Sequence, residues 1–534
     1  MDPRSAELLE LPAILERLAA LTSFDAGQRL ALGLRPSPDP GEVARRRALT
    51  EEGLRLRELG VNGPAGAADL REATEAAARG AVLEPPALVE VLAAAGIARE
   101  ARAAVAAHEA EAPLLAELLG LVDDGALARV EATLARALDP RGGLLDTASP
   151  ELAAVRRRLA AARREAIEQL RRLAGSLRSH LQEAFTTERA GRPVLAVKAS
   201  SRSAVPGIVH DSSGSGQTLF IEPMPVVEAN NRVRELAAQE AEEEERILRE
   251  LSRLVGEERA ALDGAVEALA ALDLALAAAA LARAWDAVPV EPAEEVELAG
   301  ARHPLLDPAT AVPVDLPLSG LRALVISGPN TGGKTVALKT LGLLALCHQC
   351  GLRAPARRAR LPVFDEVLAD IGDDQSIAES LSTFSAHVRR LVRIMAAAGP
   401  ASLVLLDEVA GGTDPREGGR LARAVIERLM ERGALVLATT HHPELKEWAG
   451  AAPGAANAAV GVDARALRPR YTLTVGEPGA SHALGIAERL GLDPEVVAAA
   501  RAAAPPEERR LEGLLADAAA ARAAAEEERA AARA

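Results

Sequence analysis

Residues 321–335 read LRALVISGPNTGGKT, a short apolar run followed by a glycine-rich loop that ends in lysine and threonine. The pattern G-x-x-x-x-G-K-[ST], placed after a strand and before a helix, is typical of a loop that binds nucleotide phosphates. The helix-forming stretch VALKTLGLLALC follows directly at residues 336–347. This order of strand, loop and helix predicts an α/β domain with a nucleotide site at its centre.

Each part of this loop has a chemical role in such a site. Its glycines let backbone N–H groups surround phosphate oxygens, and the helix N-terminus adds partial positive charge. We expect Lys334 to reach the β- and γ-phosphates of ATP and the Thr335 hydroxyl to bind Mg²⁺. The chain has only four lysines among 62 basic residues, so a lysine is not expected at this position by composition alone, and its presence favours a specific role. The candidate nucleotide-binding residues are Gly328, Pro329, Asn330, Thr331, Gly332, Gly333, Lys334 and Thr335.

Two further apolar runs end in polar residues that would complete an ATPase site. LVLLDE at residues 403–408 ends in Asp407, expected to hold Mg²⁺, and Glu408, expected to act as general base toward the attacking water. ALVLATTHH at residues 434–442 ends near His441, which can orient or sense the γ-phosphate. Acids and histidines also occur at strand ends for capping alone. The accompanying phosphate loop is what favours the catalytic interpretation, with Glu408, His441 and Lys334 as catalytic residues.

Composition limits the other classes of protein. A chain of 534 residues predicts more than one domain, and a net charge of −15 argues against a generally basic nucleic-acid binder. Cys347 and Cys350 have metal-ligand spacing, but no second cysteine pair completes a zinc site, so buried thiols are expected.

No segment predicts membrane insertion or secretion. The N-terminus, MDPRSAELLELPAILERL, carries acids among its apolar residues and does not resemble a secretory signal. The apolar window at residues 265–285 contains Glu267 and Asp273, which would be costly inside a bilayer. These features predict a cytoplasmic protein that makes no use of a membrane.

Changes in composition and hydrophobic pattern along the chain predict six regions. Short β-like runs rich in Ser and Gly interrupt two long helical stretches, which favours a helical hairpin with an elaborated tip. The expected regions are a helical core domain at 1–150, a first lever helix at 151–190, a β-rich clamp tip at 191–227, a second lever helix at 228–287, a P-loop ATPase domain at 288–505 and the start of a coiled coil at 506–534.

The first lever is unusually basic. Residues 151–185 hold eight arginines against four glutamates, whereas residues 232–259 hold six arginines against nine glutamates. Such a stripe can neutralise phosphates without reading bases, and four tip residues extend it: Arg189, Arg192, Lys198 and Arg202. The alternative is that the arginines of the first lever pair with the glutamates of the second as a solvated hairpin.

Taken in order, several motifs resemble the MutS family of ATPases, whose ATP domain is related to the ABC type. These are GPNTGGKT at 328–335, DIGDDQSIAESLSTFSAH at 370–387, LLDEVAGGTDP at 405–415 and ATTHHPEL at 438–445. The form STFSAH with His387, GIVHDSSGSGQTLFIEP at 207–223 and ARHPLL at 301–306 resemble its second bacterial branch, the MutS2 type.

The resemblance implies more than the loop alone. It implies an ABC-type P-loop ATPase domain joined to an all-α core and lever domain, with a clamp at the tip of two long helices. It implies a homodimer that sandwiches ATP and Mg²⁺, with Ser382 and Thr383 reaching the partner's nucleotide, Asp414 communicating across the dimer and His441 as a switch. It also implies that the helices clamp branched DNA, in suppressing recombination, or ribosomal RNA on stalled ribosomes.

The sequence also departs from this pattern. The loop after the acids differs at Val409 and Ala410 from the DELGAGTDP that members often carry. Many members of the branch continue into a small Smr nuclease domain that is not found in this sequence, so endonuclease activity is expected only if such a domain is part of the natural protein. Two other functions stay open. One is an ATP-locked dimeric scaffold that binds proteins, and the other is a mismatch-repair ATPase, although residues 1–150 offer no aromatic-bearing reader module.

Overall fold

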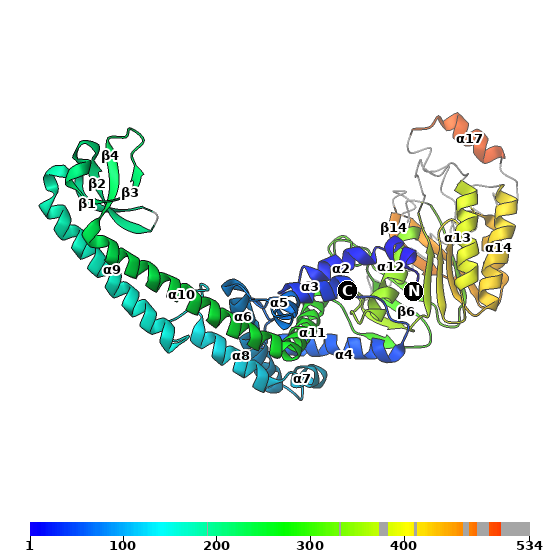
Figure 1. The fold of residues 1–534 in the computed structure, drawn as a ribbon. Coiled ribbons are helices and arrows are strands. Elements are labelled where there is room, and N and C mark those ends of the chain that lie inside the picture. The colour runs from blue at the N-terminus through cyan, green and yellow to red at the C-terminus, as the bar shows by residue number, and fades with distance from the viewer. Residues whose placement is uncertain are drawn as a thin grey trace, which may run out of the picture. The chain divides into compact units, whose positions relative to one another are not determined.

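The structure, a computed structural model, describes residues 1–189, 191–329, 333–372, 383–410, 414–462, 469–477 and 491–503 (Figure 1). The chain divides into two compact units. The first unit comprises Met1–Gly63, Ala107–Glu117 and the chain from Ala270 onward, and the second comprises Pro64–Ala106 and Leu118–Leu269. The single helical domain expected over residues 1–150 is instead divided between these units. The expected coiled coil at 506–534 lies outside the described residues.

The first unit contains the α/β domain predicted from the phosphate loop. Its helices are α1 Pro3–Leu8, α2 Leu11–Ala19, α3 Asp25–Gly33, α4 Pro40–Glu58, α12 Lys334–Gln349, α13 Thr383–Ala397, α14 Pro415–Glu431, α15 Pro443–Ala451 and α17 Pro494–Ala503. Its strands are β5 Val290–Pro292, β6 Glu297–Ala301, β7 Val314–Pro317, β8 Ala323–Ser327, β9 Arg358–Leu361, β10 Glu366–Asp370, β11 Ser402–Leu406, β12 Leu435–Thr439, β13 Ala455–Val462 and β14 Pro469–Val475. Helix α7, Pro113–Gly120, crosses the boundary between the units.

A six-stranded sheet of order β10-β11-β12-β8-β13-β14 forms the centre of this unit. Its first five strands are parallel, and β14 pairs antiparallel with β13. All residues of β8, β11 and β12 are buried, because alternate side chains meet different layers. One face packs with α1, α2 and α12, and the other with α13, α14 and α15 (Figure 1). The N-terminal helices α1 and α2 thus complete the core of the α/β domain, which is why they leave the expected helical domain.

A second sheet of order β5-β9-β6-β7 flanks the same core. Strand β5 pairs parallel with β9, and β6 pairs antiparallel with both β9 and β7. Leu298 and Leu316 from this sheet join the cluster that contains α12. Both sheets therefore bury apolar residues in one continuous core.

The second unit is a helical hairpin with a small sheet. Its elements are α5 Arg71–Ala78, α6 Pro85–Ala106, α8 Asp124–Ala137, α9 Pro150–Ser176, β1 Leu181–Arg189, β2 Arg192–Lys198, β3 Gly207–Ser212, β4 Thr218–Pro223, α10 Met224–Glu257 and the beginning of α11 Arg259–Ala284, with 3-10 turns at Arg178–His180 and Ala199–Ala204. Helices α9 and α10 lie side by side and are joined by Leu159, Ala166, Val233 and Leu236 (Figure 1). The antiparallel sheet, of order β1-β2-β4-β3, lies at their end.

Both long helices differ from the expected levers. Helix α9 ends at Ser176, and residues predicted to be helical through 190 instead form β1, where Thr186 and Thr187 favour an extended chain. The second stretch is two helices, α10 and α11, separated at Glu258. Gly256 lowers helix propensity just before this break, and a Cβ there would lie 2.8 Å from the Ala77 backbone. The glycine therefore allows α10 to approach α5 closely.

Helix α11 is long and apolar enough to span a membrane by length and composition, but 78% of that window is buried inside the protein. The side chain of Asp273 is also buried, and it accepts hydrogen bonds from the Ser23 amide (2.8 Å) and hydroxyl (2.7 Å). A Cβ on Gly27 would lie 2.1 Å from this carboxylate. These contacts are those of a core helix.

The two cysteines on α12 are free and buried, as predicted. Burial raises the pKa of the Cys347 thiol well above its usual range and that of Cys350 to about 12, so both stay protonated near neutral pH. No cluster of three or more potential metal ligands occurs among the described residues.

His348, between these cysteines, makes stability depend on pH. Its ring is buried, and neither nitrogen has a hydrogen-bond partner among the described residues. Burial, together with the Arg47 charge, lowers its pKa to about 4. Between pH 6.5 and 4 the unfolded chain binds a proton that the folded chain does not, so stability falls as pH falls. We expect a loss of about 2 kcal/mol in the free energy of unfolding from pH 7 to 5. Urea unfolding of His348→Leu should lack this loss; an unchanged pH dependence would assign it to other groups.

Candidate ATP site

The phosphate loop leaves the end of β8 and leads into α12. Gly328 has a φ of +132° and Gly333, the N-cap of α12, a φ of +91°, both in the region that favours glycine. A Cβ on Gly328 would lie 2.6 Å from Val460 Cγ2. The first N–H groups of a helix have no partner within it, so the start of α12 can bind an anion. Asn330, Thr331 and Gly332 lie outside the described residues.

Lys334 lies at the start of α12 and is buried. Its ammonium donates to the Gly328 carbonyl at 2.8 Å and lies 2.9 Å from Nε2 of His441. Burial lowers its pKa to about 8, against the opposing effect of Glu408 and Asp407. The site therefore disfavours its own cation until a further negative charge arrives, as a triphosphate would supply.

Thr335 and Asp407 offer two oxygens to a metal ion. The Thr335 hydroxyl donates to Asp407 Oδ2 at 2.8 Å. In an octahedral Mg²⁺ site with ligand distances of about 2.0–2.1 Å, neighbouring ligand oxygens lie about 2.9 Å apart. The two oxygens thus already have the separation of adjacent Mg²⁺ ligands, and both residues fit the predicted metal role.

Glu408 follows Asp407 at the end of β11 and faces solvent. Its side chain is 48% exposed, and Oε1 lies 3.4 Å from Nε2 of His441. Burial, followed by the charge of Lys334, lowers the pKa of His441, so this ring is neutral at neutral pH. A carboxylate that water can reach, beside a neutral histidine and a buried lysine, is suited to accept a proton from water.

Thr439, the last residue of β12, is a site residue that our sequence analysis missed. Its buried hydroxyl donates to Asp407 Oδ1 at 2.5 Å and accepts from the Glu408 amide at 2.8 Å. It therefore fixes the side chain of one acid and the backbone of the other. Its position at the end of the strand in ATTHH is the only signal that the sequence offers.

The residues predicted to act across a dimer are described in part. Ser382 lies outside the described residues, and Thr383 is the first residue of α13. Asp414 is the N-cap of α14, where Oδ1 accepts from the amides of Arg416 (3.0 Å) and Glu417 (3.1 Å).

The four basic tip residues differ in their surroundings. Arg189 stacks over the Phe220 ring at 3.9 Å and pairs with Asp211, and Lys198 donates to the Ser179 carbonyl. Arg202 is exposed.

Arg192 corrects the expectation of a free phosphate contact. Its side chain is only 14% exposed, and Nε lies 3.3 Å from the carboxylate of Glu222, which is fully buried. His210 Nε2 lies 2.6 Å from the same carboxylate. Because a buried carboxylate needs partners, Arg192 turns inward.

Most arginines of α9 face solvent, in contrast to the inward-turned Arg192. Arg156 pairs with Asp146, Glu240 and Glu244. The others are exposed and make no ion pair with a described residue: Arg157, Arg158, Arg163, Arg164, Arg171, Arg172 and, just beyond the helix, Arg178. The alternative of a neutralised hairpin therefore applies to Arg156 alone among the described contacts.

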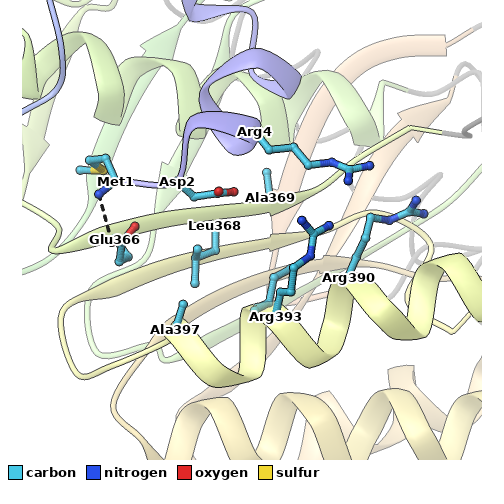
Figure 2. Close-up of a pocket in the computed structure, with 10 residues that line it drawn as sticks. Met1, Asp2, Arg4, Glu366, Leu368, Ala369, Arg390, Arg393 and Ala397 are labelled. Atoms are coloured by element: carbon cyan, nitrogen blue, oxygen red, sulfur yellow. Dashed lines mark hydrogen bonds and ion pairs between the residues drawn. The ribbon is translucent and has the colours of Figure 1, made fainter.

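A separate pocket of about 250 Å³ lies between α1, β10 and α13. Figure 2 shows Arg4, Arg390 and Arg393 toward one end of it and the ion pair of the Met1 amine with Glu366 toward the other. Its apolar walls include Leu368 and Ile394. None of the described residues predicted to bind nucleotide lines this pocket.

Residues 324–506 match the family described as MutS domain V. The chain is 49% identical over 512 residues to "Endonuclease MutS2" of Thermomicrobium roseum, 44% over 504 residues to that of Pelotomaculum thermopropionicum and 43% over 508 residues to that of Geobacillus thermodenitrificans. These alignments cover 92%, 93% and 93% of this chain and 64% of each relative. The chain thus spans less than two thirds of the length of these relatives.

Proposed function

The chain belongs to the MutS2 family, and we propose that it hydrolyses ATP as a homodimer whose long helices bind nucleic acid. The observation that carries the first part is the convergence at one site of Lys334 and Thr335, which begin α12, with Asp407 and Glu408, which follow β11; Thr335 meets Asp407, and His441 lies near both Lys334 and Glu408. "Endonuclease" in the names of the relatives describes those longer proteins. We expect this chain in the cytoplasm.

The geometry supports a direct hydrolysis step. Glu408 accepts a proton from water as the water oxygen attacks the γ-phosphorus, and the bond from that phosphorus to the bridging oxygen of ADP breaks. Lys334 holds the β- and γ-phosphate oxygens and balances the charge that develops on them. A Mg²⁺ held by Thr335 and Asp407 would neutralise the same oxygens. His441, 3.4 Å from Glu408, orients the base.

We place the partner subunit at the segment that leads into α13. Ser382 and Thr383 would meet the nucleotide of the second subunit, and Asp414 would transmit the dimer's state from the start of α14. The support for this arrangement is the resemblance of these motifs to the family's.

Helix α9 supports the nucleic-acid part of the proposal. Arg157, Arg164 and Arg171 recur every seven residues, opposite the buried Leu159 and Ala166. Seven residues rise about 10 Å along a helix, so the three guanidinium groups form a row along one face. Helix α10 instead carries more glutamates than arginines, and Arg249 and Arg253 pair within it with Glu245 and Glu257. We expect α9 to follow a phosphate backbone.

Removing this row should weaken nucleic-acid binding. In the triple variant Arg157→Ala, Arg164→Ala, Arg171→Ala, the slope of log K against log salt should decrease by about three, because each phosphate contact contributes about 0.9. Fluorescence anisotropy with duplex DNA, a four-way junction and ribosomes, each at several salt concentrations, measures this slope and identifies the preferred target.

A matched control removes the same charge from α10. Arg246→Ala, Arg249→Ala, Arg253→Ala deletes three arginines that already pair with glutamates of the same helix. Its slope should stay near that of the wild type. Equal losses in both variants would mean that net charge, not the α9 row, governs binding. An unchanged α9 variant would contradict the proposed contact.

A further inference from the structure

Four consecutive backbone amides around the acids of the ATP site each donate to a different acceptor. Those of Asp407, Glu408 and Val409 donate to the Asp370 carbonyl (2.8 Å), the Thr439 hydroxyl (2.8 Å) and the Thr439 carbonyl (3.3 Å). The amide of Ala410 donates to Nε2 of His387 at 3.2 Å. Of these four hydrogen bonds, this last one has its acceptor on a helix, in the His387 side chain of α13.

The turn held in this way has an unfavourable backbone. Glu408 has a φ of +47° and Ala410 a φ of +58°, a region that residues with a Cβ adopt rarely. Such conformations persist only where the surroundings determine them. Glu408 is one of the two residues with positive φ in this turn. The conformation of the turn therefore sets the direction of its carboxylate.

The other side of the His387 ring faces a buried carboxylate. It lies on α13, it is 12% exposed, and Nδ1 lies 2.9 Å from Oδ2 of Asp370, outside good hydrogen-bond geometry. Since Nε2 accepts from Ala410, Nδ1 is the ring nitrogen that remains to donate, and it faces that carboxylate. Asp370 is buried at the end of β10 and also pairs with Arg390, the residue three positions further along α13 that Figure 2 shows beside this strand.

We infer that His387 is a positioning residue for ATP hydrolysis, which fastens the turn 408–410 to β10 and α13 and so aims Glu408 at the attacking water. The inference rests on the proposed function. It adds a residue outside the phosphate loop, the acid pair and His441. Asp370 borders this arrangement at two points, because its carbonyl accepts from the Asp407 amide and its carboxylate lies beside the His387 ring.

The test separates turnover from binding. His387→Ala should lower kcat by about 10- to 100-fold, as expected for a misplaced catalytic group, while the Kd for ATP stays within about twofold because Lys334 and Thr335 are unaffected. His387→Gln should recover much of kcat, since its amide oxygen can accept from Ala410 and its NH₂ can face Asp370. Arg389→Ala, an exposed change two residues further along α13, is the matched control and should behave as wild type.

The outcomes distinguish this inference from the proposed function. If the wild type turns over ATP, Glu408→Gln does not, and His387→Ala keeps the wild-type kcat, then the positioning role is wrong and the ATPase proposal stands. If kcat and ATP affinity fall together in His387→Ala, or if His387→Gln recovers nothing, the role is structural and the inference is also overturned. If the wild type fails to hydrolyse ATP, the proposed function itself fails.

Discussion

Glu408→Gln will bind ATP with nearly the affinity of the wild type and will hydrolyse it about 10²- to 10⁴-fold more slowly, the usual contribution of a general base. The amide keeps the size and direction of the side chain but cannot accept the proton of the attacking water. The hydrogen bond to the Thr439 hydroxyl comes from the backbone N–H of residue 408, and the φ of +47° is also a backbone property. The substitution should therefore preserve the turn. Single-turnover hydrolysis and equilibrium ATP binding measure the two effects separately.

The same variant should accumulate ATP in a closed dimer, because the nucleotide that holds the subunits together persists. Analytical ultracentrifugation with ATP and Mg²⁺ would detect this. Glu417→Gln, in the first turn of α14, is a control that leaves the site intact. Turnover by Glu408→Gln at the wild-type rate would remove Glu408 as the base.

Lys334→Ala will lose most of the affinity for ATP, by about 10²-fold or more, as expected when one partner of a buried charge pair is deleted. The protein itself should remain folded, because burial already lowers the pKa of this lysine to about 8 and its charge is disfavoured in the empty site. Removing the cation therefore costs ligand binding rather than stability.

The lowered pKa also gives ATP binding a pH dependence. Above pH 8 the free protein loses the proton from Lys334, whereas a bound triphosphate raises the pKa of the ammonium and retains it. Binding then takes up a proton, so ATP affinity should fall as pH rises above about 8, by up to about tenfold per unit. Lys334→Ala should lack this slope.

Local motifs carried most of what the sequence could predict. The loop at 328–335 lies between β8 and α12, and Thr335 meets Asp407 as expected, although these residues are 72 positions apart. Such predictions succeed because parallel strands bring their carboxyl ends to one edge of a sheet. The buried cysteines of α12 followed in the same way from their apolar surroundings.

What the sequence could not predict depends on tertiary contacts. The apolar stripe of α9 continues in spacing to Leu181, yet the helix ends at Ser176 because the chain there pairs with β2. The sequence predicts Arg192 as a surface cation, but its side chain turns inward toward the buried carboxylate of Glu222. Thr439 and His387 act on Glu408 through bonds between distant segments, and no periodicity reveals such bonds.

The most direct test of the account is an equilibrium titration of ATP, with Mg²⁺, into wild type, Lys334→Ala and Lys339→Ala. Lys339 lies on the same helix and pairs with Glu10, so its removal deletes the same charge outside the site. We expect wild-type affinity for Lys339→Ala and a loss of about 10²-fold or more for Lys334→Ala. ATP binding by Lys334→Ala as tight as that of the wild type would contradict a nucleotide site at residues 328–335.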